Sequence, residues 1–152
     1  MTINRLDKAD VLELEHELET FGTININRYQ DVASGTAIYP GQGTVVGLWY
    51  CITKLNGEAG EAAEHIGKAF RDDEVLIMCP SQLPGAYPAF IPGQLTPARR
   101  EYLLKEAGDC LWYLGAICRE LGTTIGHIAV LNLKKLYARQ EASTLQGSGD
   151  DR

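Results

Sequence analysis

The residues with the clearest chemical potential are two pairs of acids, Glu58 with Glu61 and Glu106 with Asp109. A helix turns through about 100° per residue, so residues three apart lie near one another on its surface. Each pair is therefore predicted to place two carboxylates on one helix face. Carboxylates a few ångströms apart repel one another unless a cation neutralises them. Oxygen ligands of this type favour hard ions such as Mg²⁺ or Mn²⁺.

Two long helices must position these acids. Residues 45–71 form the first predicted helix, in which an apolar stripe beside the acids comprises Cys51, Leu55, Ala62, Ile66 and Ala69. Residues 97–121 form the second, with apolar residues at the same spacing. If the two helices pack together, all four carboxylates converge. We therefore predict a Mg²⁺ site, with Mn²⁺ as a possible substitute, whose ligands are Glu58, Glu61, Glu106 and Asp109.

The remaining pattern predicts an all-α protein, a four- to five-helix bundle. Further helices are expected at residues 9–21, from Asn27 to just before Pro40, and at residues 124–141. Residues 79–97 are rich in proline, which excludes a helix or a central strand. We expect an N-terminal helical extension (1–26), a helical domain (27–142) that contains this insertion, and a C-terminal tail (143–152).

The composition narrows the class of protein. The chain has 152 residues, about one domain, with 14 Lys and Arg against 20 Asp and Glu and a net charge of −6. This balance argues against binding to a nucleic acid polymer, which would need a basic face. No apolar stretch could cross a membrane and no signal peptide is evident, so we expect a soluble, cytoplasmic protein. The four cysteines form no CxxC pair, which favours buried thiols over a zinc site.

Several segments together carry a resemblance to a known family. The sequences GEAGE (57–61) and EAGD (106–109) resemble the ExxE...ExxD signature of the MazG-type all-α nucleoside triphosphate pyrophosphohydrolases. Segments similar to phage and bacterial MazG-like proteins also occur at 36–40 (TAIYP), 71–73 (RDD), 132–140 (NLKKLYARQ) and 147–150 (GSGD). Gly57 stands where many members carry a further acid, and residues 79–97 lengthen the separation between the acidic pairs.

The resemblance implies a Mg²⁺-dependent enzyme that converts an NTP or dNTP to its monophosphate and pyrophosphate. It also implies a homodimer or homotetramer. A purine deoxynucleotide such as dGTP is our candidate substrate, which the resemblance itself does not specify. In such a reaction Glu61 could take the proton from the attacking water. Asn132 is expected at a buried position, where its amide could read the substrate. Basic residues could bind phosphate oxygens; the predicted substrate-binding residues are Lys54, Lys68, Arg71, Asn132, Lys135 and Arg139.

Alternatives remain at this stage. The same acids could bind metal only to hold subunits together, in a non-catalytic helical assembly module. A ferritin-like di-iron protein would need Glu-x-x-His on two helices, whereas His65 lies four residues after Glu61. A single histidine on such a face is more often structural. The proline-rich residues 79–97 could cover a ligand or form a surface insertion.

Overall fold

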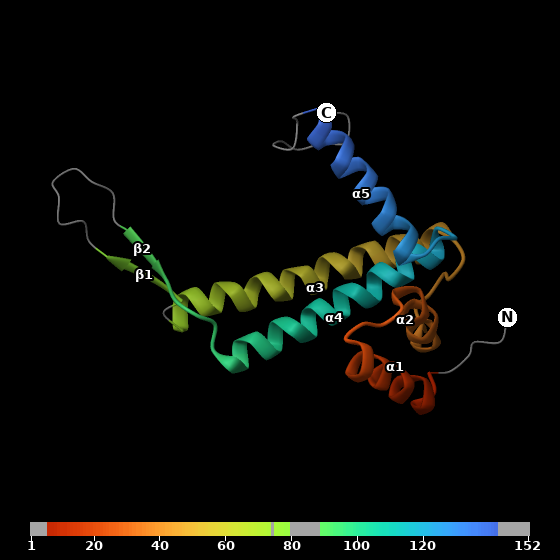
Figure 1. Cartoon of the computed structure of the whole chain (residues 1–152), viewed down its shortest axis with the longest axis horizontal. Coiled ribbons are helices and arrows are strands. Elements are labelled where there is room, and N and C mark those ends of the chain that lie inside the picture. The colour runs from red at the N-terminus through yellow and green to blue at the C-terminus, as the bar shows by residue number, and fades with distance from the viewer. Residues whose placement is uncertain (1–5, 74, 80–88, 143–152) are drawn as a thin grey trace. The chain divides into compact units, whose positions relative to one another are not determined.

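The computed structural model describes residues 6–73, 75–79 and 89–142. This part of the chain is predominantly helical, which confirms the all-α part of the predicted fold class (Figure 1). The order of elements is α1 (Lys8–Phe21), α2 (Ile26–Ala33), the 3-10 helix η1 (Ser34–Thr36), α3 (Val45–Asp72), β1 (Leu76–Cys79), β2 (Ala89–Pro92), α4 (Pro97–Glu120) and α5 (Ile125–Glu141). None of these described helices combines the length and apolar composition needed to span a membrane.

Most helix boundaries agree with the predicted ones because local capping determines them. The hydroxyl of Thr96 accepts a hydrogen bond from the Arg99 N–H at 3.2 Å, and α4 begins at Pro97. The hydroxyl of Thr124 caps α5 in the same way. Helix α1 ends at Phe21 and is capped by Gly22, whose φ of 68° is the left-handed conformation that favours glycine.

The predicted bounds of α2 were wrong at both ends. The side chain that caps this helix belongs to Asn25, not Asn27, and accepts from the N–H groups of Asn27 and Arg28. The Asn27 side chain instead accepts a hydrogen bond from the Gly126 N–H at 2.9 Å. The Asn27 side chain therefore contacts α5 and does not cap α2, although the local pattern predicts that it would. Helix α2 ends at Ala33 and continues as η1, well before Pro40.

The chain divides into two compact units. Unit 1 combines residues 1–51 with 114–152, and unit 2 is the continuous segment 52–113. Helices α3 and α4 each contribute one part to unit 1 and the other part to unit 2. The predicted acids all belong to unit 2.

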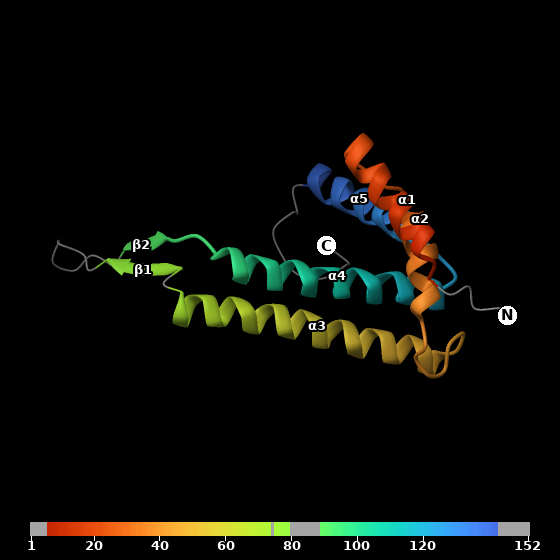
Figure 2. The same cartoon turned by 90° about the horizontal axis from the view of Figure 1, so that it is seen from below.

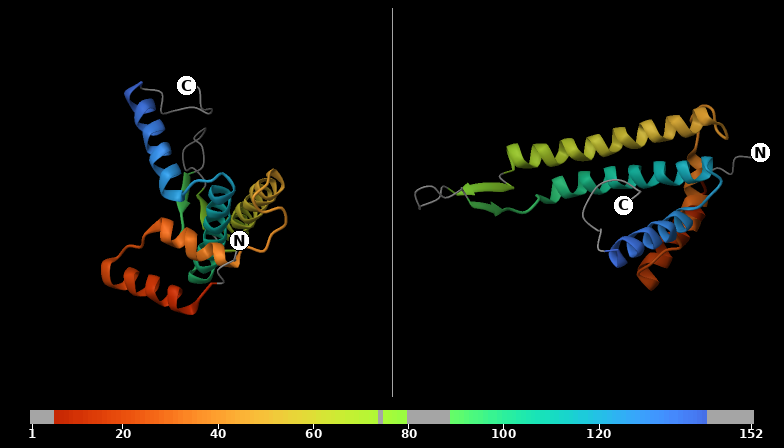
Figure 3. Two further views of the ribbon diagram at one scale, coloured as in Figure 1. Left: turned by 90° about the vertical axis from the view of Figure 1, so that its right-hand side faces the viewer. Right: turned by 90° about the horizontal axis from the view of Figure 1, so that it is seen from above.

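Unit 1 is organised around a buried glutamine. Gln30 on α2 is only 7% exposed, yet its amide is satisfied: it accepts from the Ile125 N–H at 2.7 Å and donates to the Thr123 carbonyl at 3.1 Å. Figure 3 shows α1 beside α2, where Arg28 forms ion pairs with two α1 glutamates. The buried apolar side chains of this unit are Ala37, Tyr39, Cys51, Ala116, Cys118 and Ile125.

A glycine-containing loop leads into α3 and is fixed by the end of α4. The carboxylate of Glu120 accepts from the Tyr39 hydroxyl at 2.5 Å and from the Gly43 N–H at 2.7 Å. Gly41 has a φ of 72° and its carbonyl accepts from the Gly47 N–H at 3.0 Å. A side chain at Gly47 would lie 2.5 Å from that carbonyl oxygen, so the close approach requires glycine there.

Unit 2 is a pair of antiparallel helical segments, and a small ribbon lies between them along the chain. Its parts of α3 and α4 run side by side in both views (Figures 1 and 2). Strands β1 and β2 pair in an antiparallel ribbon from Leu76 opposite Pro92 to Cys79 opposite Ala89, which was not predicted. Proline is tolerated because each strand of a two-stranded ribbon is an edge. Residues 80–88 of the proline-rich segment lie outside the described residues.

A bidentate ion pair joins the end of α3 to the start of α4, the two helices between which the ribbon lies. The Arg99 guanidinium on α4 donates to the carboxylate of Asp73, which follows α3, at 2.9 and 3.2 Å. The two side chains are only 14% and 16% exposed. Partial burial and the paired geometry make such a contact stronger than an ordinary surface ion pair. It ties the end of α3 to the start of α4, and so fixes the register in which the two helices pair.

Candidate metal centre

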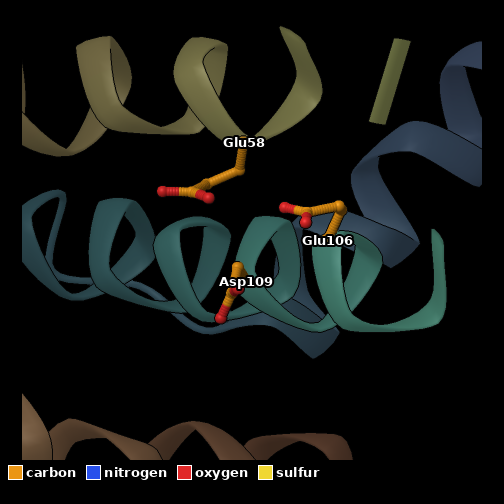
Figure 4. Close-up of side chains that lie close together, drawn as sticks. All are labelled: Glu58, Glu106 and Asp109. Atoms are coloured by element: carbon orange, nitrogen blue, oxygen red, sulfur yellow. The ribbon is translucent and has the colours of Figure 1, made fainter. Parts of the chain in front are cut away.

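Three of the four predicted ligands come together between α3 and α4. Glu58 extends from α3, and Glu106 and Asp109 lie one turn apart on α4 (Figure 4). One carboxylate oxygen from each lies within 4.8 Å of the other two. Glu58 and Glu106 are partly buried, whereas Asp109 is exposed. The group is thus held by two helices and remains open to solvent at one of its members.

The electrostatics of this group disfavour three free carboxylates. Burial is the largest cause that raises the pKa of Glu58 above its ordinary value, followed by the negative charge of Glu61. The charges of Asp109 and Glu106 raise this pKa further, whereas the ammonium of Lys54 lowers it. A cation bound to the group would reverse this balance, because it favours the ionised form of each ligand.

The donor set fits a hard divalent cation. Octahedral Mg²⁺ binds oxygen at about 2.0–2.1 Å, so its ligand oxygens lie about 3 Å apart when adjacent and about 4 Å apart when opposite. The carboxylate oxygens of the group lie within 4.8 Å of one another, close to those separations. Three carboxylates also leave positions for water or phosphate oxygens, as expected for Mg²⁺ at a phosphate site. Glu58, Glu106 and Asp109 are therefore the residues that could hold the ion.

Glu61, the predicted catalytic base and fourth ligand, is not a member of the compact group. Its side chain is exposed, one turn beyond Glu58 on α3. It is nevertheless close enough for its charge to raise the pKa of Glu58. Its position at the solvent side of the cluster keeps it available to a water molecule. The predicted role of Glu61 stays a prediction.

The basic residues predicted on α3 have different surroundings. Lys54 is exposed, and its charge acts on Glu58. Lys68 forms an ion pair with Glu64 at 2.6 Å, and Arg71 forms two hydrogen bonds with Asp72 at 2.6 and 2.8 Å. Of these three, Lys54 is the one whose charge is among the causes that shift the pKa of Glu58.

The substrate-binding residues predicted on α5 belong to unit 1. Asn132 is exposed, so the prediction that it occupies a buried apolar position was wrong. The reason is that this side of α5 is not covered by the described part of the chain, and Leu131 and Leu133 beside it are 51% and 64% exposed. Lys135 is also exposed and Arg139 is partly buried. That these three residues bind substrate stays a prediction.

Two further residues lie next to the acids and were not among the predicted site residues. His65 shares the acidic stripe of α3, and its Nε2 lies 3.7 Å from a carboxylate oxygen of Glu106. Burial, followed by the charges of Glu58, Glu106 and Asp109, raises the pKa of the Cys110 thiol. Cys110 therefore stays protonated and unreactive beside the cluster. The sequence signal for His65 was its spacing of seven residues from Glu58, which places both on one helix face.

The fold and the acidic group define a class: a helical protein with a three-carboxylate cluster suited to a divalent cation. The chain is 34% identical over 132 residues to the "Gene 37 protein" of Mycobacterium phage L5, a match that covers 85% of this chain and 100% of the phage protein. The chain therefore belongs to the same family as that phage protein, whose name states no activity. No protein-family profile matches the chain. No solved structure matches it.

Proposed function

We propose that the protein is a Mg²⁺-dependent nucleoside triphosphate pyrophosphohydrolase, a hydrolase that acts on phosphorus-containing anhydrides. Its substrate would be an NTP or dNTP, with purine deoxynucleotides such as dGTP as first candidates, and its products the monophosphate and pyrophosphate. The observation that carries the proposal is the convergence of Glu58, Glu106 and Asp109 within 4.8 Å. The resemblance of the two acidic motifs to the MazG-like signature supports it.

The charges explain why this cluster suits a triphosphate only with a cation. Three carboxylates by themselves repel an anionic substrate. Bound Mg²⁺ would neutralise charge on the phosphate oxygens and orient the attacking water. The protein's own part is to hold the ligand oxygens of Glu58, Glu106 and Asp109 on two packed helices, where their geometry changes little.

Glu61 and Lys54, which lie on either side of Glu58 along α3, would supply the proton acceptor and a phosphate contact. Glu61 is exposed and one turn away on the same helix, so its carboxylate can accept the proton of a water held at the cluster. Lys54 lies one turn before Glu58 and can bind a phosphate oxygen. Lys68 and Arg71 could do the same after exchanging their present carboxylate partners, and Asn132, Lys135 and Arg139 are the proposed contacts from α5.

The chain is proposed to act in the cytoplasm as a homodimer or homotetramer. Large apolar side chains remain exposed along α5 and α1, which is unusual for a monomer. On α5 they are Val130, Leu131, Leu133, Leu136 and Tyr137. A nucleotide substrate requires no membrane or nucleic acid polymer as a partner.

The test is pyrophosphate release from a panel of NTPs and dNTPs with Mg²⁺ or Mn²⁺. We expect metal-dependent formation of monophosphate and pyrophosphate by wild type, and a loss of about 100-fold or more in Glu61→Gln and Asp109→Asn, as for a lost general base or metal ligand. Glu101→Gln is the matched control, because Glu101 lies on α4 but is exposed and paired with Lys105.

Absence of pyrophosphate release would also discriminate between the two candidate functions. A folded, metal-binding wild type that cleaves no triphosphate would overturn the enzyme proposal. If chelation then unfolded or dissociated the protein, the cluster would be a structural site in a non-catalytic assembly module. If Asp109→Asn kept its activity, the active site would not be this cluster.

A further inference from the structure

His65 lies against one of the proposed metal ligands. Its ring projects from α3, and Nε2 lies 3.7 Å from Oε1 of Glu106 on α4. The side chains are only 18% and 13% exposed, so water screens this contact poorly. The distance is slightly longer than a hydrogen bond, and a small rotation of the carboxylate would close it. Hydrogen bonds at active sites often tighten in this way when the ligand binds.

The partner determines where the ring carries its proton. An ionised carboxylate only accepts hydrogen bonds, so the nitrogen that faces Glu106 must be the donor. In the neutral ring Nδ1 then has a lone pair and no proton. Nδ1 is buried, and among the described residues it has no hydrogen-bond partner. A buried polar atom without a partner disfavours folding, so packing alone does not explain a histidine here.

A neighbouring ring holds the imidazole in place. His65 stacks on Tyr102 with ring centroids 4.9 Å apart and an interplanar angle of 6°. Tyr102 lies four residues before Glu106 on α4, about one turn. Both residues that fix the histidine therefore belong to the helix that carries two of the three clustered acids. The stack sets the plane of the ring, and that plane directs Nε2 at Glu106.

We propose that His65 is a positioning residue, which holds the Glu106 carboxylate in its metal-binding orientation by donating from Nε2. His65 itself is not a member of the group whose ligand atoms lie within 4.8 Å, so it acts through Glu106. Carboxylate ligands of metal sites are commonly oriented by such hydrogen bonds. The inference rests on the proposed function in that it takes the acidic cluster as the metal site.

The experiment measures Mn²⁺ binding to the full chain by calorimetric titration, alongside the unfolding temperature in EDTA. His65→Phe keeps the volume and the stack on Tyr102 but removes the donor. We expect it to weaken Mn²⁺ binding about tenfold or more, the usual effect of losing such a partner. Its unfolding temperature without metal should be unchanged or higher, because the buried unpaired nitrogen is gone.

Two further variants separate positioning from packing. His65→Gln loses the stack but keeps an N–H near the position of Nε2, and its Mn²⁺ affinity should stay within about threefold of wild type. His127→Gln makes the same chemical change at an exposed histidine of α5 and should leave both readouts unchanged. The Mn²⁺ concentration needed for half-maximal triphosphate cleavage should follow the measured affinities.

The outcomes distinguish this inference from the proposed function. Wild-type Mn²⁺ affinity in His65→Phe would overturn the positioning role and leave the enzyme proposal intact. Equal loss of affinity in His65→Phe and His65→Gln, with lower unfolding temperatures, would show a packing role and also overturn it. Mn²⁺ binding that weakens as expected, without any triphosphate cleavage by wild type, would support the positioning role and overturn the proposed enzyme. A wild type that binds no Mn²⁺ would overturn both.

Discussion

At the scale of single residues, the ionisation of the Glu58 side chain opposes folding. Burial and three neighbouring acids raise its pKa above the ordinary value of 4.5. The folded state therefore prefers the protonated carboxyl more strongly than the unfolded state does. Stability from this group is fully present below pH 4.5 and is lost as the pH rises through the higher pKa of the folded state.

Glu58→Gln should accordingly stabilise the metal-free protein at pH 7. We expect a gain of about 0.5 kcal/mol, typical of removing like-charge repulsion on a helix, and no gain at pH 4, where the wild-type carboxyl is mostly protonated. Urea denaturation in EDTA at both pH values measures the difference. Glu64→Gln on the same helix is the control and should show no gain, because a hydrogen bond from Lys68 lowers the pKa of Glu64. Equal stability of Glu58→Gln and wild type at pH 7 would contradict the expectation.

Helical spacing alone predicted which acids could share a site, and three of the four converge. It could not predict that Glu58, and not Glu61, joins the two acids of α4. That choice depends on the rotation of α3 about its axis, which is set by the packing of half-buried side chains such as Leu55 and Ile66. Glu58 faces α4 for this reason, whereas Glu61 remains at the exposed side. The contact of His65 with Glu106 depends on the same rotation.

At the scale of elements, α3 carries glycines with opposite roles. Gly47 lies where a Cβ would meet the Gly41 carbonyl oxygen at 2.5 Å, so its small size is required. Around Gly57 and Gly60, which flank Glu58, a Cβ would meet no atom of the described residues within 4 Å. Nothing described in this chain therefore accounts for two residues that weaken a helix by about 1 kcal/mol each relative to alanine.

Alanine substitutions should reveal this contrast. Gly57→Ala and Gly60→Ala are each expected to raise the free energy of unfolding by up to about 1 kcal/mol, because alanine favours the helix. Gly47→Ala is the matched control in the same helix and should lower stability through its backbone clash. Chemical denaturation of the three variants measures the effects. A loss of stability in Gly57→Ala or Gly60→Ala would contradict the expectation and indicate a close neighbour, such as a second chain.

The elements themselves were largely predictable because their limits are local. Pro97 after Thr96 and the Thr124 cap fix the starts of α4 and α5 through contacts within a few residues. The start of α2 was not predictable, because the Asn27 side chain binds Gly126, 99 residues later in the chain. The ribbon of β1 and β2 was missed for a related reason, since strand pairing joins residues that no helical or turn pattern connects.

At the scale of the whole molecule, the exposed apolar side chains are the reason for proposing that the chain functions in an assembly. On α5, Val130, Leu133 and Tyr137 are spaced at helical intervals along one face and are 50%, 64% and 63% exposed. Burying such a stripe removes apolar surface from water at about 25 cal/mol per Å². The composition and periodicity of the sequence could not reveal this, since an apolar stripe looks the same whether it faces the chain's own core or another copy.

Wild type should therefore sediment as a dimer or tetramer, and Leu133→Asp should shift it towards the monomer. The substitution introduces a charge into the exposed stripe, where it costs little in a single chain but opposes burial in an interface. Asn132→Asp adds the same charge on a different face of α5 and is expected to leave the assembly unchanged. Light scattering coupled to size-exclusion chromatography measures the mass. A monomeric wild type would refute the assembly, and an unaltered Leu133→Asp would place the interface elsewhere.

Unit 1 is built from two separate segments of the chain, and this constrains the order in which the protein can fold during synthesis. Its contacts join the two ends of the sequence: Gln30 binds Ile125, 95 residues later, and Gly43 binds Glu120, 77 residues later. Unit 2 is continuous from residue 52 to residue 113. A ribosome releases the whole of unit 2, with its acidic cluster, before Glu120 and Ile125 have emerged, and domains form as their segments become available. The parts of α3 and α4 that carry the acids can thus pair before Thr123 and Ile125, the hydrogen-bond partners of Gln30, have left the ribosome.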